Sequence, residues 1–354
     1  MNQVFSLAFE IHSSYFRFPK NQFVVKSFLL VLSLVICAKS FGQISAEEER
    51  FVNRLKASSS LPEKLLDTRT GVFYTYTMTD KELEKIQLSF QRTGVDAIAY
   101  FETDELLAGT DVTLAYADYL NKRDIKNLAI FQKTDKGYKV ILTLFNTKAN
   151  IVEENQYAWI AEDPSLDELL KKIYRAAGGG LKSLNKLIND YPETDLTINP
   201  IQGRRSDFYA IDLKVDELAV PKTGNEAMDK ALEATFSTYP FKFKFTEPGL
   251  SEADLRKKGF LYVLCFVHTR GSVAKKLLGY DMSKSESALV SMTYPDGAQP
   301  QLKNIPSETF VYKFYFKHID SDNVFLGTKW DADVTWEQAL KNQVKGFKTE
   351  LKVE

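Results

Sequence analysis

The order of apolar and polar positions along this chain predicts a series of alternating strands and helices. Residues 72–76 are aromatic and β-branched, as is typical of a strand, and Thr79 with Glu82 forms a capping box that begins a helix ending at Gly94. Further along the first half we expect strands at 95–101, 128–131, 138–145 and 157–160, with helices at 111–123 and 165–177.

The second half continues with the same kinds of element. Phe241, Phe243 and Phe245 alternate with Lys242 and Lys244, which predicts a half-buried strand with one wet face. The other expected strands are 208–211, 261–269, 288–294, 310–318 and 324–328, and the expected helices are 226–236, 251–258 and 335 to about 351.

The order of these elements indicates a tandem duplication. The segment DPSLDELLK at 163–171 is paralleled by DVTWEQALK at 333–341, and the changing offset between matches implies insertions around residues 295–306. The alternative is two ordinary α/β domains that share capping chemistry by chance. We therefore predict an α/β (or α+β) protein with two tandem related domains, 43–177 and 207–354, each a mixed β-sheet packed with helices. A mostly extended linker at 178–206 joins them.

The first 42 residues have the pattern of a secretory signal peptide. Lys26 precedes an apolar run at 28–37, and small residues at Ser40 and Gly42 precede a polar stretch, so we expect cleavage after Gly42. The run is about ten residues long, whereas a membrane-spanning helix needs roughly 20. The residues before Lys26 are unusual for a leader, and a start at Val24 or Val25 would give a conventional one.

Charge and cysteine content limit which partners the protein can bind and how its fold can be stabilised. Without the leader, the 46 basic and 47 acidic residues of the chain become 42 and 46, so the mature protein lacks the basic character that nucleic-acid binding needs. Cys265 is then the single cysteine, which excludes an intrachain disulfide. It stands in an apolar run that predicts a buried strand, where a thiol is structural rather than reactive.

Two aspartates are the candidates for catalytic chemistry. Asp331 and Asp333 lie between an expected strand and the last helix, where α/β enzymes often place carboxylates. Asp333 also stands where a negative charge offsets the helix dipole, and Asp163 occupies the same place in the first half. A structural device used twice therefore explains the pair more simply.

Aromatic residues are the candidates for a binding surface. On the strand at 310–318, Phe310, Tyr312, Phe314 and Phe316 share one face, which we expect to be buried. Tyr315 lies on the other face between two lysines, and is the best candidate for an exposed aromatic contact.

Motifs for metals and cofactors are missing from the sequence. His268 and His318 are isolated and no CxxC or HxxxH occurs, so no zinc site is expected. The glycines at 178–180 follow a helix instead of opening one, and the spacing of a phosphate-binding loop is absent. We assign no catalytic residue, no metal and no cofactor.

These features favour an exported, noncatalytic binding or scaffold protein of the bacterial cell envelope, periplasmic or secreted. Its expected partner is another envelope protein or a small ligand, with no nucleic acid and no stable transmembrane anchor. The alternative is a carboxylate-dependent hydrolase or transferase that uses Asp331 and Asp333.

Overall fold

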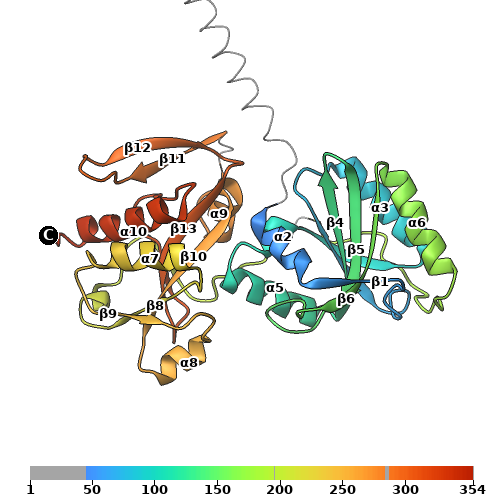
Figure 1. Cartoon of the computed structure of the whole chain (residues 1–354), viewed down its shortest axis with the longest axis horizontal. Coiled ribbons are helices and arrows are strands. Elements are labelled where there is room, and N and C mark those ends of the chain that lie inside the picture. The colour runs from blue at the N-terminus through green and yellow to red at the C-terminus, as the bar shows by residue number, and fades with distance from the viewer. Residues whose placement is uncertain (1–44, 195, 284–286, 354) are drawn as a thin grey trace, which may run out of the picture. The chain divides into compact units, whose positions relative to one another are not determined.

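The computed structural model describes residues 45–194, 196–283 and 287–353 (Figure 1). The signal peptide expected at 1–42, with its cleavage point after Gly42, lies outside these ranges. Within them the chain forms two large mixed sheets of six strands each, packed with helices, which confirms the α/β class. No helix in this part of the chain is long and apolar enough to cross a membrane.

The first sheet has the strand order β1-β6-β5-β4-β2-β3. In this sheet β2 runs parallel to both β3 and β4, β5 runs antiparallel to both β4 and β6, and β1 runs parallel to β6. The strands are β1 (Leu55–Ser58), β2 (Arg69–Tyr74), β3 (Asp96–Glu102), β4 (Ile125–Thr134), β5 (Gly137–Leu144) and β6 (Gln156–Asp163). The helices are α2 (Ala46–Asn53), α3 (Asp80–Thr93), α4 (Thr103–Leu106), α5 (Thr110–Lys122) and α6 (Leu166–Gly178).

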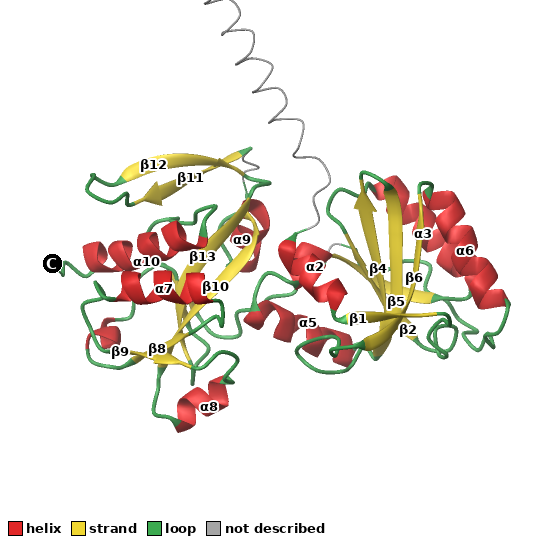
Figure 2. Ribbon diagram, viewed as in Figure 1, coloured by secondary structure: helices red, strands yellow, loops and turns green. Residues whose placement is uncertain are grey.

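Helices cover both faces of this sheet (Figure 2). Val72 of β2 packs in one apolar cluster with Ile86 of α3 and Ile173 of α6, whereas its neighbour Phe73 packs in another with Tyr116 of α5. Because both faces are covered, the central strands bury successive residues and not only alternate ones.

The second sheet has the strand order β7-β14-β13-β10-β8-β9. Its strands are β7 (Arg205–Ser206), β8 (Leu218–Pro221), β9 (Phe243–Thr246), β10 (Tyr262–Arg270), β13 (Phe310–His318) and β14 (Val324–Phe325). The helices are η1 (Ile211–Lys214), α7 (Glu226–Phe236), α8 (Glu252–Lys257), α9 (Gly271–Leu277) and α10 (Trp336–Glu350). Between α9 and β13 the chain adds a separate antiparallel pair, β11 (Ala288–Thr293) and β12 (Gln301–Pro306).

The two sheets have the same strand order and the same strand directions. Read from one edge, the first sheet is β3-β2-β4-β5-β6-β1 and the second is β9-β8-β10-β13-β14-β7. In both sheets the third strand in the chain is at this edge, followed across the sheet by the second, fourth, fifth, sixth and first. As in the first sheet, the second strand in the chain, β8, runs parallel to both its neighbours β9 and β10. The strand β13 runs antiparallel to both β10 and β14, and β7 runs parallel to β14. The pair β11–β12 has no counterpart between β4 and β5, which are joined by a short turn.

One expectation for the second half was wrong, and one strand was not anticipated. Residues 208–211 do not form a strand, because Phe208 and Ile211 project into solvent and the strand follows at β8. The segment at 301–306 was not expected to be a strand, yet it pairs with β11 as β12. Its polar residues give no apolar alternation, so its pairing depends on β11 rather than on a pattern of its own.

The linker also has a structural role. Tyr100 N–H of β3 donates to the Glu193 carbonyl at 2.8 Å, and Glu193 N–H donates to the Ile98 carbonyl at 2.9 Å. These bonds form a parallel bridge between Ala99 and Glu193. The linker therefore pairs at Ala99 with the outer edge of β3, which is the last strand of the first sheet.

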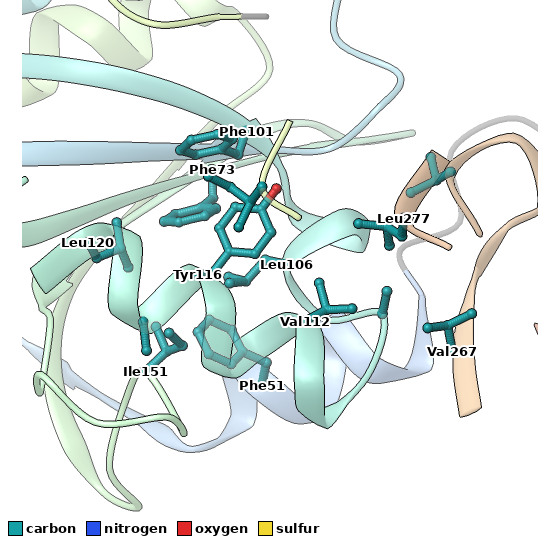
Figure 3. Close-up of a cluster of buried hydrophobic side chains, with 14 of the residues drawn as sticks. Phe51, Phe73, Phe101, Leu106, Val112, Tyr116, Leu120, Ile151, Val267 and Leu277 are labelled. Atoms are coloured by element: carbon teal, nitrogen blue, oxygen red, sulfur yellow. The ribbon is translucent and has the colours of Figure 1, made fainter. Parts of the chain in front are cut away.

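The apolar cluster around α5 continues into the second half of the chain (Figure 3). Val267 of β10 and Leu277 of α9 belong to the same cluster as Val112 of α5. Gly109 precedes α5 where the backbones come close: a Cβ at this position would lie 2.8 Å from the Phe266 carbonyl oxygen. The region therefore requires glycine at 109.

Candidate functional site

Asp331 lies in the segment between β14 and α10, as the sequence indicated, and is buried in an ion pair. Its Oδ1 is 2.6 Å from Nζ of Lys313 on β13, and the lysine side chain is completely buried. Lys313 also donates to the Leu326 carbonyl at 2.9 Å and to Gln343 Oε1 of α10 at 3.1 Å. The ammonium group therefore has three oxygen neighbours and ties β13 to the last helix.

Burial acts on both members of this pair. It raises the pKa of Asp331 and lowers the pKa of Lys313, because each loses the hydration of its charged form. The attraction between the two charges opposes both shifts. Lys313 and Asp331 are therefore held against each other inside the fold, and both side chains are buried.

Asp333 is engaged in a second ion pair. Both its carboxylate oxygens accept from Nζ of Lys303 on β12, at 3.0 and 2.9 Å, and its backbone pairs with Tyr312 of β13. Thr335 caps α10 by accepting from Gln338 N–H at 3.3 Å, and its own N–H is 3.4 Å from Asp333 Oδ1. The position beside the helix start agrees with the structural interpretation of this residue.

Tyr315 was expected to be exposed, and this expectation was wrong. The side chain is buried, and its hydroxyl donates to Asp111 Oδ2 of α5 at 2.9 Å. Lys317 on the same face is buried as well, within 2.7 Å of Glu252 and 3.4 Å of Asp111. The face of β13 that holds Tyr315 is covered by α9 and by the side chains of Asp111 of α5 and Glu252 of α8, which no local pattern in β13 could reveal.

A third group of charges was not anticipated from the sequence. We call Arg270, Glu102, Asp104 and Glu308 the Arg270 cluster. Arg270 Nε donates to Asp104 Oδ2 at 2.8 Å, Nη1 donates to Glu308 Oε2 at 2.6 Å, and Nη2 donates to Glu102. Only 6% of Arg270 is exposed, and its guanidinium also stacks over the Tyr76 ring.

The Arg270 cluster lies at the carboxyl end of β3. Glu102 is the last residue of this strand, and Asp104 follows in α4. In open α/β sheets, ligands commonly bind beyond the carboxyl ends of parallel strands. In this protein Arg270 from the end of β10 holds the acidic groups there. The only available signal was the acidic run at 102–105 directly after an expected strand.

Glu48 of α2 lies near this cluster and has an unusual environment. It is buried, and Gln132 Nε2 of β4 donates to its Oε1 at 2.8 Å. Burial, assisted by the charge of Asp104, raises the pKa of Glu48 to about 7. The protonated form of Glu48 is therefore favoured well above the pH range in which a glutamate ordinarily ionises.

His268 and Cys265 are engaged in packing contacts. His268 stacks on Tyr312 with ring centroids 3.8 Å apart, and its Nδ1 is 3.1 Å from Glu47 Oε1. Burial raises the pKa of the Cys265 thiol well above its usual range, which disfavours the reactive thiolate. Among the residues that the structure describes, no group of ligating side chains could hold a metal ion.

Comparison of the sequence with protein-family models and with curated proteins found no match in either case. Function must therefore be inferred from the contacts described above.

Proposed function

We propose that this chain is an exported, noncatalytic protein of the bacterial cell envelope that acts as a binding or scaffold module in the periplasm or after secretion. It consists of a signal peptide at 1–42, two duplicated α/β domains at 43–177 and 207–354, and a linker at 178–206. Its partner is another envelope protein or a small ligand.

The shared topology of the two sheets supports the duplication. Six strands can be arranged in many orders and directions, and both sheets use the same one. The repeated capping segments at 163–171 and 333–341 precede or begin α6 and α10, which are the final helices of the two halves. The pair β11–β12 then represents an insertion in the second copy.

The observation that carries the noncatalytic role is the way in which strand-end carboxylates are used. Asp331 pairs with Lys313, Asp333 with Lys303, and Asp104 with Arg270. A carboxylate-dependent hydrolase needs a carboxylate that can reach substrate and exchange protons with it. Each of these three groups is instead buried against a cation of the fold.

Turnover measurements test the catalytic alternative. The mature protein and its Asp331→Asn and Asp333→Asn variants are assayed on chromogenic esters, phosphate esters and glycosides, and their melting temperatures are recorded. We expect no turnover above that of a heat-denatured sample. Turnover that Asp333→Asn abolishes without lowering the melting temperature would replace the proposal with the hydrolase.

Cell fractionation with mass mapping of the N-terminus tests export. We expect the protein in the periplasm or the medium, with Gln43 as its first residue. A cytosolic protein with an intact leader would contradict the proposal, whatever the activity assays show.

A further inference from the structure

The outer edge of β9 has unused backbone hydrogen-bonding groups. β9 is the last strand of the second sheet and pairs with β8 on one side (Figure 1). The carbonyls of Lys242 and Thr246 accept from β8 and the residue after it, at 3.1 and 3.0 Å. In a parallel ladder, the backbone N–H and C=O groups of one residue point toward the neighbouring strand, and those of the next residue point away from it. The N–H and C=O groups of Phe243 and Phe245 therefore face the outer edge, where no described residue bonds to them.

The corresponding edge of the first sheet is occupied. β3 has the place in its sheet that β9 has in the other, and the linker pairs with it in parallel through Glu193. The Glu193 carboxylate is bound by Tyr119 and Arg123 of the first half. This edge thus receives an extended acidic segment, and a cation next to the strand recognises its carboxylate.

The edge of β9 also has cations, at the start of the strand and within it. Lys242 and Lys244 are exposed, and neither forms an ion pair with any described residue. The side chains of Phe243 and Phe245 point to the opposite face and pack around Phe236 of α7. A strand added at this edge would therefore lie beside two unpaired positive charges.

We propose that the outer edge of β9 binds an extended acidic segment of another protein, which adds to the sheet as a parallel strand. Its backbone bonds to Phe243 and Phe245, and its carboxylates lie near Lys242 and Lys244. Strand addition of this kind derives affinity from the backbone and specificity from alternate side chains. The inference rests on the proposed binding role and names the class of partner.

Edge lysines can also have a purely protective role, because charge on an edge strand discourages pairing between copies. The two roles give opposite results with an acidic peptide. A binding edge takes up the peptide through backbone bonds, whereas a protective edge leaves it in solution.

A synthetic peptide provides the probe. The blocked peptide Thr-Glu-Val-Glu-Val-Thr is titrated into the full mature protein, with Thr-Lys-Val-Lys-Val-Thr as the matched control. Hydrogen exchange is followed at the amides of Phe243 and Phe245. The Tyr100 amide, which already bonds to Glu193, is the internal reference. We expect fast exchange at Phe243 and Phe245 in the free protein, protection with the acidic peptide, and no change at Tyr100.

Charge-reversed variants test the role of the lysines. Lys242→Glu with Lys244→Glu should weaken binding of the acidic peptide about tenfold, because two favourable charge contacts become repulsive. Lys81→Glu with Lys136→Glu changes the net charge equally at exposed positions of the first half and should leave binding unchanged. The effect at β9 should shrink as salt is added.

Three results would overturn the inference: no protection of Phe243 and Phe245 at millimolar peptide, equal binding of the two peptides, or self-association of the β9 variant without peptide binding by the wild type. The last result would assign the lysines a protective role. Any of these results would exclude an acidic strand as the partner without affecting the proposed function. Export and the absence of turnover are tested separately, by the fractionation and turnover experiments.

Discussion

At the scale of single residues, the most consequential feature is the buried pair of Lys313 and Asp331. Removing one member of a buried ion pair typically costs about 3–5 kcal/mol, because the other charge stays without compensation. Replacing both members by apolar side chains of similar size is often nearly neutral.

We therefore expect Asp331→Asn to lower the free energy of unfolding by about 3–5 kcal/mol, and Asp331→Leu combined with Lys313→Met to cost much less. Chemical denaturation of the wild type, of Asp331→Asn and of the double variant measures the free energy of unfolding of each. Asp320→Asn, which removes an exposed partner of Arg256, serves as the control and should change stability little. Equal losses in the single and double variants would show that the pair itself stabilises the fold.

Glu48 gives the fold a pH dependence of known sign. Its pKa is about 7 in the folded protein against an ordinary value of 4.5. Between these values the folded state binds more protons than the unfolded state, so this residue lowers stability as pH rises from about 4.5 to about 7. Below that window it has no effect, and above it the loss is complete.

The Glu48→Gln variant should remove this dependence. We expect it to be more stable than the wild type at pH 8, by up to about 3 kcal/mol, with a smaller difference at pH 5. Denaturation at several pH values measures both quantities. A constant difference between the two proteins from pH 5 to pH 8 would contradict the assignment of the titration to Glu48.

At the scale of elements, two helical glycines should respond in opposite directions to alanine. Gly346 lies inside α10, and a Cβ there would have its nearest neighbours at 3.8 Å, which is ordinary contact. Gly94 ends α3 with a φ of 92°, a left-handed conformation that side chains disfavour.

We expect Gly346→Ala to stabilise the protein by about 0.5–1 kcal/mol and Gly94→Ala to destabilise it by about 1 kcal/mol. Thermal unfolding of both variants against the wild type provides the measurement. A loss of stability in Gly346→Ala would mean that the space beside Asp331 and Tyr209 must stay open.

The local signals of the sequence located most helices. The capping box of Thr79 with Glu82 forms as expected, and Thr335 caps α10. Such signals depend on a few neighbouring residues and are visible in the sequence. The exposure expected for Tyr315 was wrong because its hydroxyl donates to Asp111, 204 positions earlier, and α9 packs against the same face of β13. Coverage by a distant element leaves no mark on strand periodicity.

The sequence predicted where the two candidate aspartates lie in the chain of elements, but not which residues they contact. Asp331 and Asp333 do lie between β14 and α10, but their partners Lys313 and Lys303 come from β13 and β12. The Arg270 cluster was missed because Arg270 is separated from Glu102 and Asp104 by more than 160 positions in the chain. Ion pairs between distant segments require the tertiary structure.

At the scale of the whole molecule, the Arg270 cluster connects the two halves of the chain together with Tyr315 and Asp111. Removing Arg270 leaves Asp104 and Glu102 close together without their cation. Arg270→Met should therefore lower the free energy of unfolding by about 3–5 kcal/mol, as other broken buried pairs do.

Denaturant titrations of Arg270→Met and of Arg256→Met provide the measurement. Arg256 forms an exposed pair with Asp320, so its variant should differ little from the wild type. Similar stabilities of the two variants would show that the contacts of Arg270 do not help to hold the halves together.

The linker that pairs with β3 has a consequence for the order of folding. Its residue Glu193 follows α6 and precedes β7, so it becomes available once the strands of the first sheet have emerged and before any strand of the second. Open strand edges make partly folded chains prone to aggregate. A chain that emerges N-terminus first from the membrane can thus pair this edge with its own next residues before the second half has followed.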